Sequence, residues 1–183
     1  RATSLNFKDI SMARTRSRPL VPLSDGAGEV IAVGEGVRRF AVGDRVMGAF
    51  FPHWIDGDMQ REYIRVALGD STDGMLAEQV ITPEGGLVKT PDYLTDEEAA
   101  TLPAAAVTAW HALYEQTVLY PGQTVLLLGT GGVSIFGLQL ARLGGLRTIV
   151  TSSSDEKLER ARALGAHETV NYRTREDWDR AVL

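Results

Sequence analysis

A short apolar run at 125–128 ends in closely spaced glycines, and the segment after them repeats apolar residues at a helical period. Those repeated positions are Val133, Phe136, Leu140 and Leu143. The pattern predicts a strand, a glycine turn and an amphipathic helix, in that order. Gly129 would permit the tight turn and Gly131 would let the backbone approach a phosphate at the helix N-terminus. Ser134 stands at the third position of the G-x-G-x-x-G/A pattern, where its small side chain still permits close packing. This stretch therefore predicts a dinucleotide-binding loop.

The chain beyond that helix continues the alternation of strands and helices. Extended segments are predicted at 148–151 and 168–171. The helix between them is expected to begin at a capping box, Ser153–Glu156, and to end at Gly165. A further helix is expected from Thr174 onward. This order predicts a parallel, doubly wound sheet, of which three strands form one mononucleotide half.

The first hundred residues have a different character, rich in β-compatible residues and punctuated by glycine. A capping box from Thr95 to Glu98 begins a helix that Pro103 should break or kink before 104–115 resumes it. Residues 51–73 are expected to form a long irregular excursion. The strands predicted in this part lie at 26–34, 42–47, 77–81 and 86–89.

Composition narrows the class of protein without identifying it. The 183 residues are 44% hydrophobic and carry a formal net charge of −5, which argues against a nucleic-acid partner. No apolar run reaches transmembrane length and no signal segment opens the chain, so a cytoplasmic protein with no membrane partner is predicted. Cysteine is absent, which excludes disulfides and cysteine-ligated zinc. A start without Met and a helical pattern at the last residues predict a fragment.

Four stretches together resemble the medium-chain dehydrogenase/reductases, in order and spacing, over nearly the whole chain. They are Leu5–Asp9, Gly26–Val46, Glu98–Pro103 with Thr108–Trp110, and Gly129–Ser134. The resemblance implies an α/β architecture in two domains, with the active site in the cleft between them. Residues 1–100 would be a partial GroES-like β-barrel catalytic domain lacking its N-terminal strands. Residues 101–183 would be the first half of a Rossmann doubly wound parallel sheet, and the full-length protein a homodimer.

The family divides by its use of zinc, and the residues here resemble the zinc-free, quinone-oxidoreductase-like branch. The positions that match the catalytic zinc ligands of the alcohol dehydrogenases are Asn6, Ser24 and Ala104. Ala has no ligating atom, and Asn and Ser are poor zinc ligands beside thiolate and imidazole. No metal site and no zinc cofactor are therefore expected.

Without zinc, hydride transfer from a reduced nicotinamide to an activated acceptor remains feasible. The resemblance implies an NADPH-dependent, zinc-independent oxidoreductase acting on a small quinone, enone or similar carbonyl compound. Asn6 is the candidate hydrogen-bond donor to the developing oxyanion, Asp9 would orient it, and Thr108 would touch the nicotinamide. Asp25 is interpreted as a structural hydrogen-bonding group. The alternatives are an NAD(P)-dependent alcohol dehydrogenase, and a non-catalytic nucleotide-binding protein or inactive fragment.

The end of the second predicted Rossmann strand bears on the choice of cofactor. An acid there would hold the ribose of NAD, whereas this chain has neutral hydroxyls, Ser152 and Ser153. Lys157 and Tyr172 match positions that contact the 2′-phosphate in NADPH-dependent relatives, which favours NADP(H) over NAD(H). The cofactor-binding set comprises Thr108, Gly129, Thr130, Gly131, Gly132, Val133, Ser152, Ser153, Lys157 and Tyr172.

Overall fold

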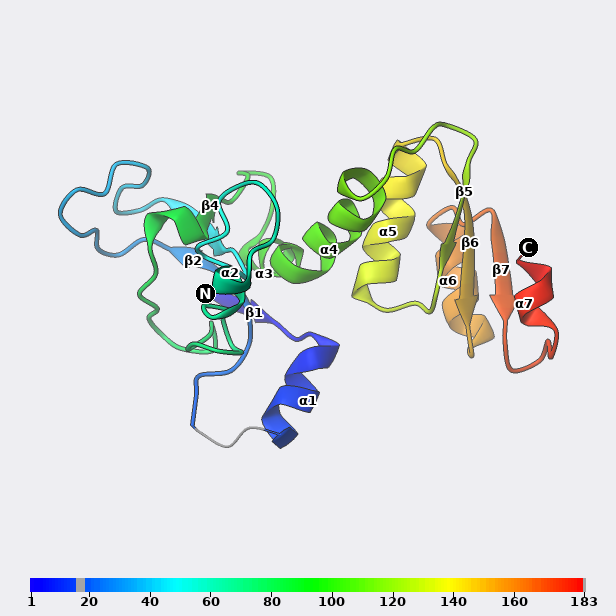
Figure 1. Ribbon diagram of the computed structural model, residues 1–183, viewed down its shortest axis with the longest axis horizontal. Helices are drawn as coiled ribbons and strands as arrows, with labels where there is room; N and C mark the ends of the chain where they lie inside the picture. Colours follow the sequence, from blue (N-terminus) through cyan, green and yellow to red (C-terminus); the bar gives the residue numbers. More distant parts are fainter. Residues whose placement is uncertain (16–18, 183) are drawn as a thin grey trace. The chain divides into compact units, whose positions relative to one another are not determined.

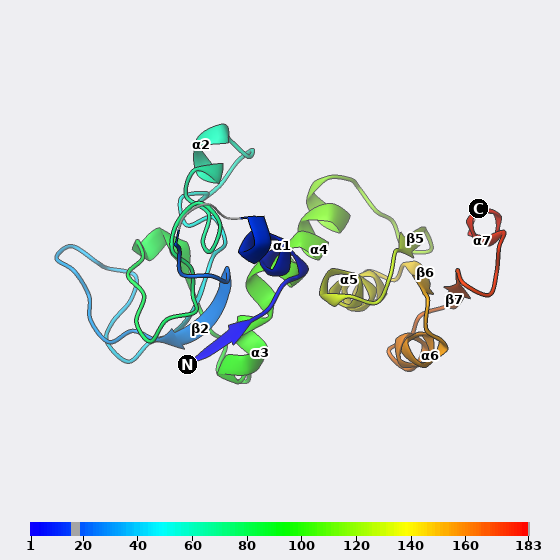
Figure 2. The same ribbon diagram turned by 90° about the horizontal axis from the view of Figure 1, so that it is seen from below.

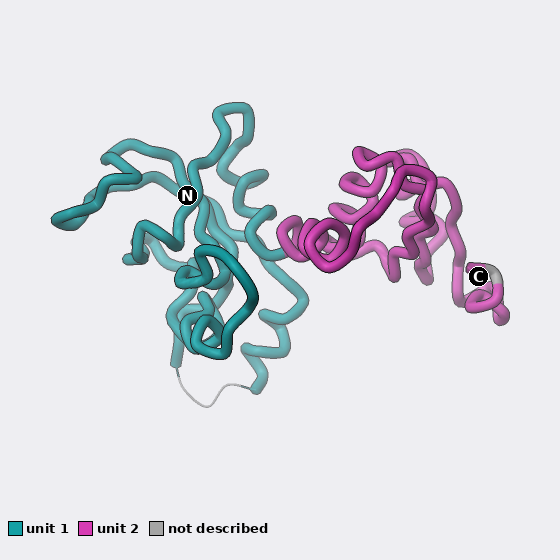
Figure 3. Tube along the Cα trace, turned by 45° about the horizontal axis from the view of Figure 1, so that its top comes forward, with its two compact units in different colours: residues 1–104 teal, residues 105–183 magenta. Residues whose placement is uncertain are grey.

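The computed structural model describes residues 1–15 and 19–182. The chain divides into two compact units, which we call unit 1 (Arg1–Ala104) and unit 2 (Ala105–Leu183); Figure 3 colours them separately. Unit 1 is built on an antiparallel sheet and unit 2 on a parallel sheet. The two kinds of sheet are those predicted for the two parts of the chain.

The sheet of unit 1 has four short strands in sequence order, and each pairs antiparallel with the next. Its strands are β1 (Ala2–Ser4), β2 (Asp25–Glu29), β3 (Arg45–Gly48) and β4 (Leu87–Lys89). Its helices are α1 (Phe7–Thr15), α2 (Arg61–Ile64), the 3₁₀ turn η1 (Glu84–Gly86) and α3 (Asp96–Ala100). Helix α3 packs on β1 and β2 through the small buried side chains of Ala27, Ala99 and Ala100.

Two strand predictions in unit 1 extend too far or are wrong. The predicted strand at 26–34 ends at Glu29, and no strand forms at 77–81. Ile31 and Val33 are exposed by 62% and 46%, and residues 77–81 are all exposed. Both stretches contain strand-compatible apolar residues, but these side chains are exposed, so burial does not stabilise an extended conformation.

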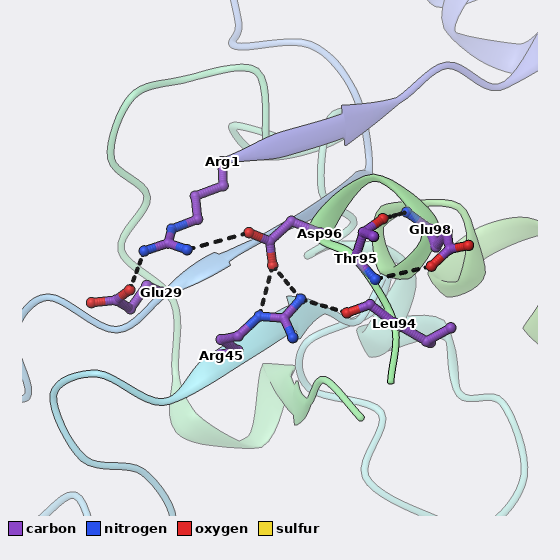
Figure 4. A network of polar contacts seen from close by, with 7 residues as sticks. All are labelled: Arg1, Glu29, Arg45, Leu94, Thr95, Asp96 and Glu98. Carbon is purple, nitrogen blue, oxygen red and sulfur yellow. Dashed lines mark hydrogen bonds and ion pairs between the residues drawn. The ribbon is translucent and has the colours of Figure 1, made fainter. Parts of the chain in front are cut away.

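A network of charges and hydrogen bonds ties α3 to the sheet of unit 1 (Figure 4). The Arg45 guanidinium donates to the Asp96 carboxylate at 2.7 Å and to the Leu94 carbonyl. Arg1 pairs with Asp96 and with Glu29. The predicted capping box at Thr95 is confirmed, because the Glu98 amide donates to the Thr95 hydroxyl and the Thr95 amide donates to the Glu98 carboxylate.

The sheet of unit 2 has three parallel strands with helices between them (Figure 1). The strands are β5 (Thr124–Leu127), β6 (Arg147–Ser152) and β7 (Glu168–Asn171), in that spatial order. The connecting helices are α5 (Gly132–Leu143) and α6 (Asp155–Ala163), which lie on the same face of the sheet in Figures 1 and 2. Both strand–helix–strand connections are expected to be right-handed, and both move in the same direction across the sheet, from β5 to β6 to β7. Two such connections place their helices on the same face.

Unit 2 confirms most of its predicted elements and corrects two details. Gly165 ends α6 with φ +94°, as expected of a residue just past a helix C-terminus. The capping residue of α6 is Ser154 rather than Ser153, and its partner three residues on is Lys157, so no reciprocal capping box forms. The last helix, α7 (Trp178–Ala181), begins four residues later than predicted.

The helical segment around Pro103 confirms the predicted break, because α3 ends at Ala100 and helical turns resume and run to Glu115. It consists of two π-helical turns, η2 (Leu102–Ala106) and η3 (His111–Glu115), flanking the short helix α4 (Val107–Trp110). Proline has no backbone N–H and therefore disrupts regular α-helical hydrogen bonding, which accounts for the first irregular turn.

The core of unit 2 lies between the sheet and its two helices. Leu138, Val150, Leu158 and Ala161 form a buried cluster there, against which Leu127 packs. In the described part of the chain, no helix has both the length and the apolar character needed to cross a bilayer.

Asp96 provides a pH-dependent test of the network that ties α3 to the sheet. Hydrogen bonds from Arg45, with the charges of Arg45 and Arg1, lower the pKa of Asp96. Its stabilising contribution is therefore complete above the ordinary aspartate pKa and disappears as the pH falls through the lower folded value. Replacing Asp96 by Asn should lower the free energy of unfolding by about 2 kcal/mol at neutral pH. In urea titrations this difference should shrink to zero in strong acid.

The control is Glu97→Gln, an exposed acid in the same helical turn that shares the helix-dipole effect. It should cost far less at neutral pH. An Asp96→Asn penalty that persists unchanged at acid pH would contradict the assignment of charge as its cause.

Candidate functional site

Asp25 in unit 1 accepts hydrogen bonds from its neighbour Ser24 and from two distant parts of the chain. Its Oδ2 accepts from the Asn6 side-chain Nδ2 at 2.9 Å and lies 3.4 Å from the Ala104 backbone nitrogen, which also donates. Its Oδ1 accepts from the Ser24 hydroxyl at 3.0 Å. These donors come from the residue before α1, the residue before β2 and the end of unit 1. We call Asp25 with these three residues the Asp25 cluster.

The Asp25 carboxyl is completely buried, with 0% of the residue exposed. Burial raises its pKa, because desolvation disfavours the charged form, and this effect exceeds the opposing ones. The three hydrogen bonds and the positive charge of Lys8 favour the carboxylate and lower the pKa. The Lys8 ammonium itself lies 4.0 Å from the centre of the Phe50 ring. The predicted structural role of Asp25 thus agrees with its contacts.

Asp9 does not contact the Asn6 side chain in the way that the family resemblance implied. Its Oδ2 accepts from the Asn6 backbone nitrogen at 2.7 Å, and its own amide donates to the Asn6 carbonyl. Both contacts hold the backbone at the start of α1. The side-chain amide of Asn6 is held by Asp25 instead. The structure thus brings Asn6 and Asp9 together, but the partner that orients the amide is a different acid.

A strained backbone precedes the Asp25 cluster. Leu23 has φ +68°, a left-handed conformation that costs a residue with a Cβ about 1–2 kcal/mol. Its carbonyl accepts from the Met75 amide at 2.7 Å. A Cβ at Gly74 would lie 2.0 Å from the Leu23 oxygen, and one at Gly69 would lie 2.5 Å from it, so both glycines are required for the close approach. Nothing in the sequence pattern predicted a left-handed leucine at this point.

The Asp25 cluster occupies the positions at which the resemblance would place zinc ligands, and its donors fit zinc poorly. Asn6 directs its amide nitrogen, which carries no available lone pair, toward Asp25, and Ala104 offers only a methyl group. Within residues 1–15 and 19–182, no group of three or more acidic or histidine side chains could hold a metal ion. We therefore derive no chemical step through a metal.

The glycine loop in unit 2 lies between β5 and α5, as predicted. Gly129 has φ +83°, and Gly131 caps α5 without any side-chain acceptor for the amides of the first turn. A Cβ at either glycine would meet nothing within 4 Å, and residues 131–133 are exposed. The Gly129 amide donates to the buried Thr151 hydroxyl at 3.2 Å, which fixes the loop to the end of β6. An exposed helix N-terminus without a capping side chain fits a phosphate group.

Close packing of α5 on β5 is achieved by a residue that the motif did not include. Gly137 is buried, and a Cβ there would lie 2.9 Å from Leu127 Cδ2. Ser134, expected to permit the close contact, instead donates its hydroxyl to the Leu128 carbonyl at 3.0 Å. An isolated glycine inside a helical pattern usually has such a packing reason, so Gly137 was recognisable from sequence.

The residues predicted for the ribose end of the cofactor lie around the carboxyl ends of β6 and β7. Ser152 is buried, and its carbonyl accepts from the Tyr172 amide at 3.1 Å. Lys157 is exposed on the first turn of α6, and Ser153 is half-buried. The nearby Asp155 carboxylate is occupied, because it accepts from the Asn171 side chain at 2.7 Å. This hydrogen bond supports a structural role for Asp155.

The remaining predicted residues of the nucleotide site also lie in unit 2. Thr108 is an exposed residue of α4, a helix that packs against α5. Thr130 and Gly132 belong to the glycine loop, and Val133 on the first turn of α5 is 45% exposed. The nucleotide candidates are therefore all in unit 2, whereas Asn6 and Asp9 are in unit 1.

Comparison with known proteins identifies the family. Residues 1–92 match the model of the alcohol dehydrogenase GroES-like domain, and residues 132–183 match the zinc-binding dehydrogenase model. A zinc-type alcohol dehydrogenase-like protein of Schizosaccharomyces pombe is 44% identical over 100% of this chain and 55% of its own length. A quinone oxidoreductase of Pseudomonas aeruginosa is 36% identical over 100% of this chain and 51% of its own.

The architecture agrees with solved structures of the same family. The crystal structure of an NAD-dependent alcohol dehydrogenase superposes with a TM-score of 0.85 at 38% identity, covering 98% of this chain and 56% of that one. The chain belongs to the medium-chain dehydrogenase/reductase superfamily, a family of NAD(P)-dependent oxidoreductases. It spans about half the length of the curated relatives it matches.

Substitutions at two glycines of the loop distinguish an effect on stability from an effect on nucleotide binding. Gly129→Ala should lower the free energy of unfolding by about 1–2 kcal/mol, because alanine would be forced into a left-handed conformation. Gly131→Ala should leave stability nearly unchanged, because Gly131 has φ −78° and ψ 176° and its Cβ meets no atom of the protein. If the loop binds a dinucleotide, the added methyl should nevertheless weaken NAD(P)H binding, since it projects where a pyrophosphate would approach.

Urea unfolding and fluorescence titration with NADPH measure the two effects on each variant. Unchanged affinity in Gly131→Ala would show that the nucleotide does not bind at this loop.

Proposed function

We propose that the protein is an NADPH-dependent, zinc-independent oxidoreductase that transfers hydride to a quinone, an enone or a similar carbonyl acceptor. The observation that carries the proposal is the Asp25 cluster. At the three positions matched to zinc ligands it has Asn6, Ser24 and Ala104, and each of these donates a hydrogen bond to the Asp25 carboxylate. This leaves Asn6, a neutral donor, as the polar group available to an acceptor oxygen.

The proposed chemistry divides between the two units. In unit 2 the glycine loop and α5 bind the pyrophosphate, and Thr108 contacts the nicotinamide. When bound, NADPH supplies the hydride. In unit 1 the Asn6 amide donates a hydrogen bond to the acceptor oxygen, where negative charge develops as hydride adds to the conjugated carbon. Activated acceptors need only this modest stabilisation, because their conjugation already spreads the charge.

A preference for NADPH rests on the residues at the ends of β6 and β7. Ser152 and Ser153 put no negative charge beside the ribose, and the exposed ammonium of Lys157 can pair with a 2′-phosphate. The Asp155 carboxylate is already bound to Asn171, which favours a structural use over a contact with a ribose hydroxyl.

An alcohol dehydrogenase is the second candidate, and the names of similar proteins favour it. They include the zinc-type alcohol dehydrogenase-like protein and the NAD-dependent alcohol dehydrogenase. Oxidation of an unactivated alcohol in such enzymes relies on a Lewis acid that polarises the oxygen. The donors of the Asp25 cluster fit zinc poorly, so we rank this activity below reduction of an activated acceptor.

The experiment that tests the proposal follows NADPH oxidation by the full-length protein with a panel of quinones, enones and simple alcohols. Turnover of quinones or enones with a chelator present is expected. Lys157→Ala should raise the KM for NADPH about tenfold, the worth of one charge-assisted contact, while leaving the KM for NADH unchanged.

The matched control is Arg160→Ala, in the last turn of the same helix. Arg160 forms an ion pair with Glu156 and is not among the residues proposed to contact the cofactor. It should leave both KM values unchanged. Absence of turnover with every activated acceptor would refute the hydride-transfer proposal, and a clear preference for NADH would refute the assignment of Lys157.

A further inference from the structure

The Asn6 side chain is turned away from its own helix. Asn6 immediately precedes α1, a position where an Asn side chain commonly accepts from a backbone amide of the first turn. Here the Asp9 amide donates to the Asn6 backbone carbonyl instead, while the Asn6 side chain donates to Asp25, nineteen residues further along the chain. Because the Asn6 side chain bonds to the distant Asp25 and not to the first turn of its own helix, we infer that it has a use beyond helix capping.

The partner determines which way the Asn6 amide faces. A carboxylate can only accept hydrogen bonds, and the Asp25 carboxylate receives them from Ser24 and Ala104 as well. The side-chain nitrogen of Asn6 must therefore face Asp25, and the flipped amide would place two acceptors against each other. One N–H of the Asn6 amide is used by Asp25, and the second N–H of the same nitrogen is left to donate elsewhere.

The backbone around Asp25 is held in place by two features. Asp25 pairs with Ser4 across β1 and β2, two residues before Asn6. On its other side lies Leu23, whose left-handed backbone is enclosed by Gly69 and Gly74. Strain of this kind persists only where the surroundings over-determine it, and it is concentrated at functional sites. The rigid frame limits the movement of the acceptor that Asn6 faces.

We propose that Asp25 is the positioning residue of the active site: it holds the Asn6 amide in the one orientation that presents an N–H to the acceptor oxygen. This inference rests on the proposed function. Asp25 touches neither substrate nor cofactor and acts only through Asn6. Replacing it by Asn removes that constraint with almost no change of shape, because an amide can pair with the Asn6 side chain in either orientation.

The test is a double-mutant cycle on the full-length protein with Asp25→Asn, Asn6→Ala and both together. Asp25→Asn should lower kcat about tenfold while leaving the KM for NADPH unchanged. In the Asn6→Ala background the same substitution should have no further effect on kcat, because the group that it positions is gone. Full additivity of the two losses would overturn the proposal, as would an unchanged kcat in Asp25→Asn.

The matched control is Asp96→Asn, the same substitution at a largely buried carboxylate of the same unit. It should lower the melting temperature without lowering kcat. A structural role for Asp25 alone would make the two variants behave alike, with stability lost and kcat kept.

A second measurement separates this inference from the proposed function. The ¹⁵N spectrum of the Asn6 side-chain amide should show one protected proton in the wild type, and Asp25→Asn should weaken that protection, because the amide is then free to adopt both orientations. If the wild type transfers no hydride but the protection behaves as described, the proposed function fails while the positioning contact stands. If the wild type is active but Asp25→Asn leaves the amide spectrum unchanged, the positioning inference alone is overturned.

Discussion

The buried carboxylate of Asp25 is the constraint on which the organisation of unit 1 depends. A charge without contact with water must be satisfied by hydrogen bonds, and the chain meets this requirement with its neighbour Ser24 and with donors from two distant segments. The requirement brings the start of α1, the start of β2 and the end of the unit to one point. Removing the carboxylate would leave three donors facing each other across a buried site.

This arrangement is the basis of the proposal that the protein works without a metal. Positions that resemble zinc-ligand sites carry an amide, a hydroxyl and a methyl group, and the neighbouring acid organises them. The strained Leu23 and the glycines packed against it keep that acid in place. What remains for chemistry is a neutral hydrogen-bond donor, which suits acceptors that already delocalise charge.

Much of the fold followed from local patterns, because the elements of unit 2 depend on short-range periodicity and on glycine. The strand before Gly129, the helix after Gly131 and the stop at Gly165 are all determined within a few residues. Predictions were wrong where the conformation of a segment depends on whether distant parts of the chain bury it. Residues 77–81 have a strand-like composition, but no neighbouring element covers them.

The candidate site shows the same division. Asn6 was recognisable from the motif, but its actual partner was not, because Asp25 meets it only once β1 and β2 have paired. The left-handed Leu23 had no sequence signature at all. Gly137 had one, since an isolated glycine inside an apolar helical pattern points to a close packing contact.

The central claim, that a hydrogen-bonded carboxylate stands in place of a metal site, is tested most directly by metal stoichiometry. The full-length protein would be produced in zinc-supplemented medium, desalted and analysed by native mass spectrometry and elemental analysis. The account predicts much less than one zinc per chain and the same catalytic rate with or without added zinc. One tightly held zinc per chain, lost together with activity on chelation, would contradict it.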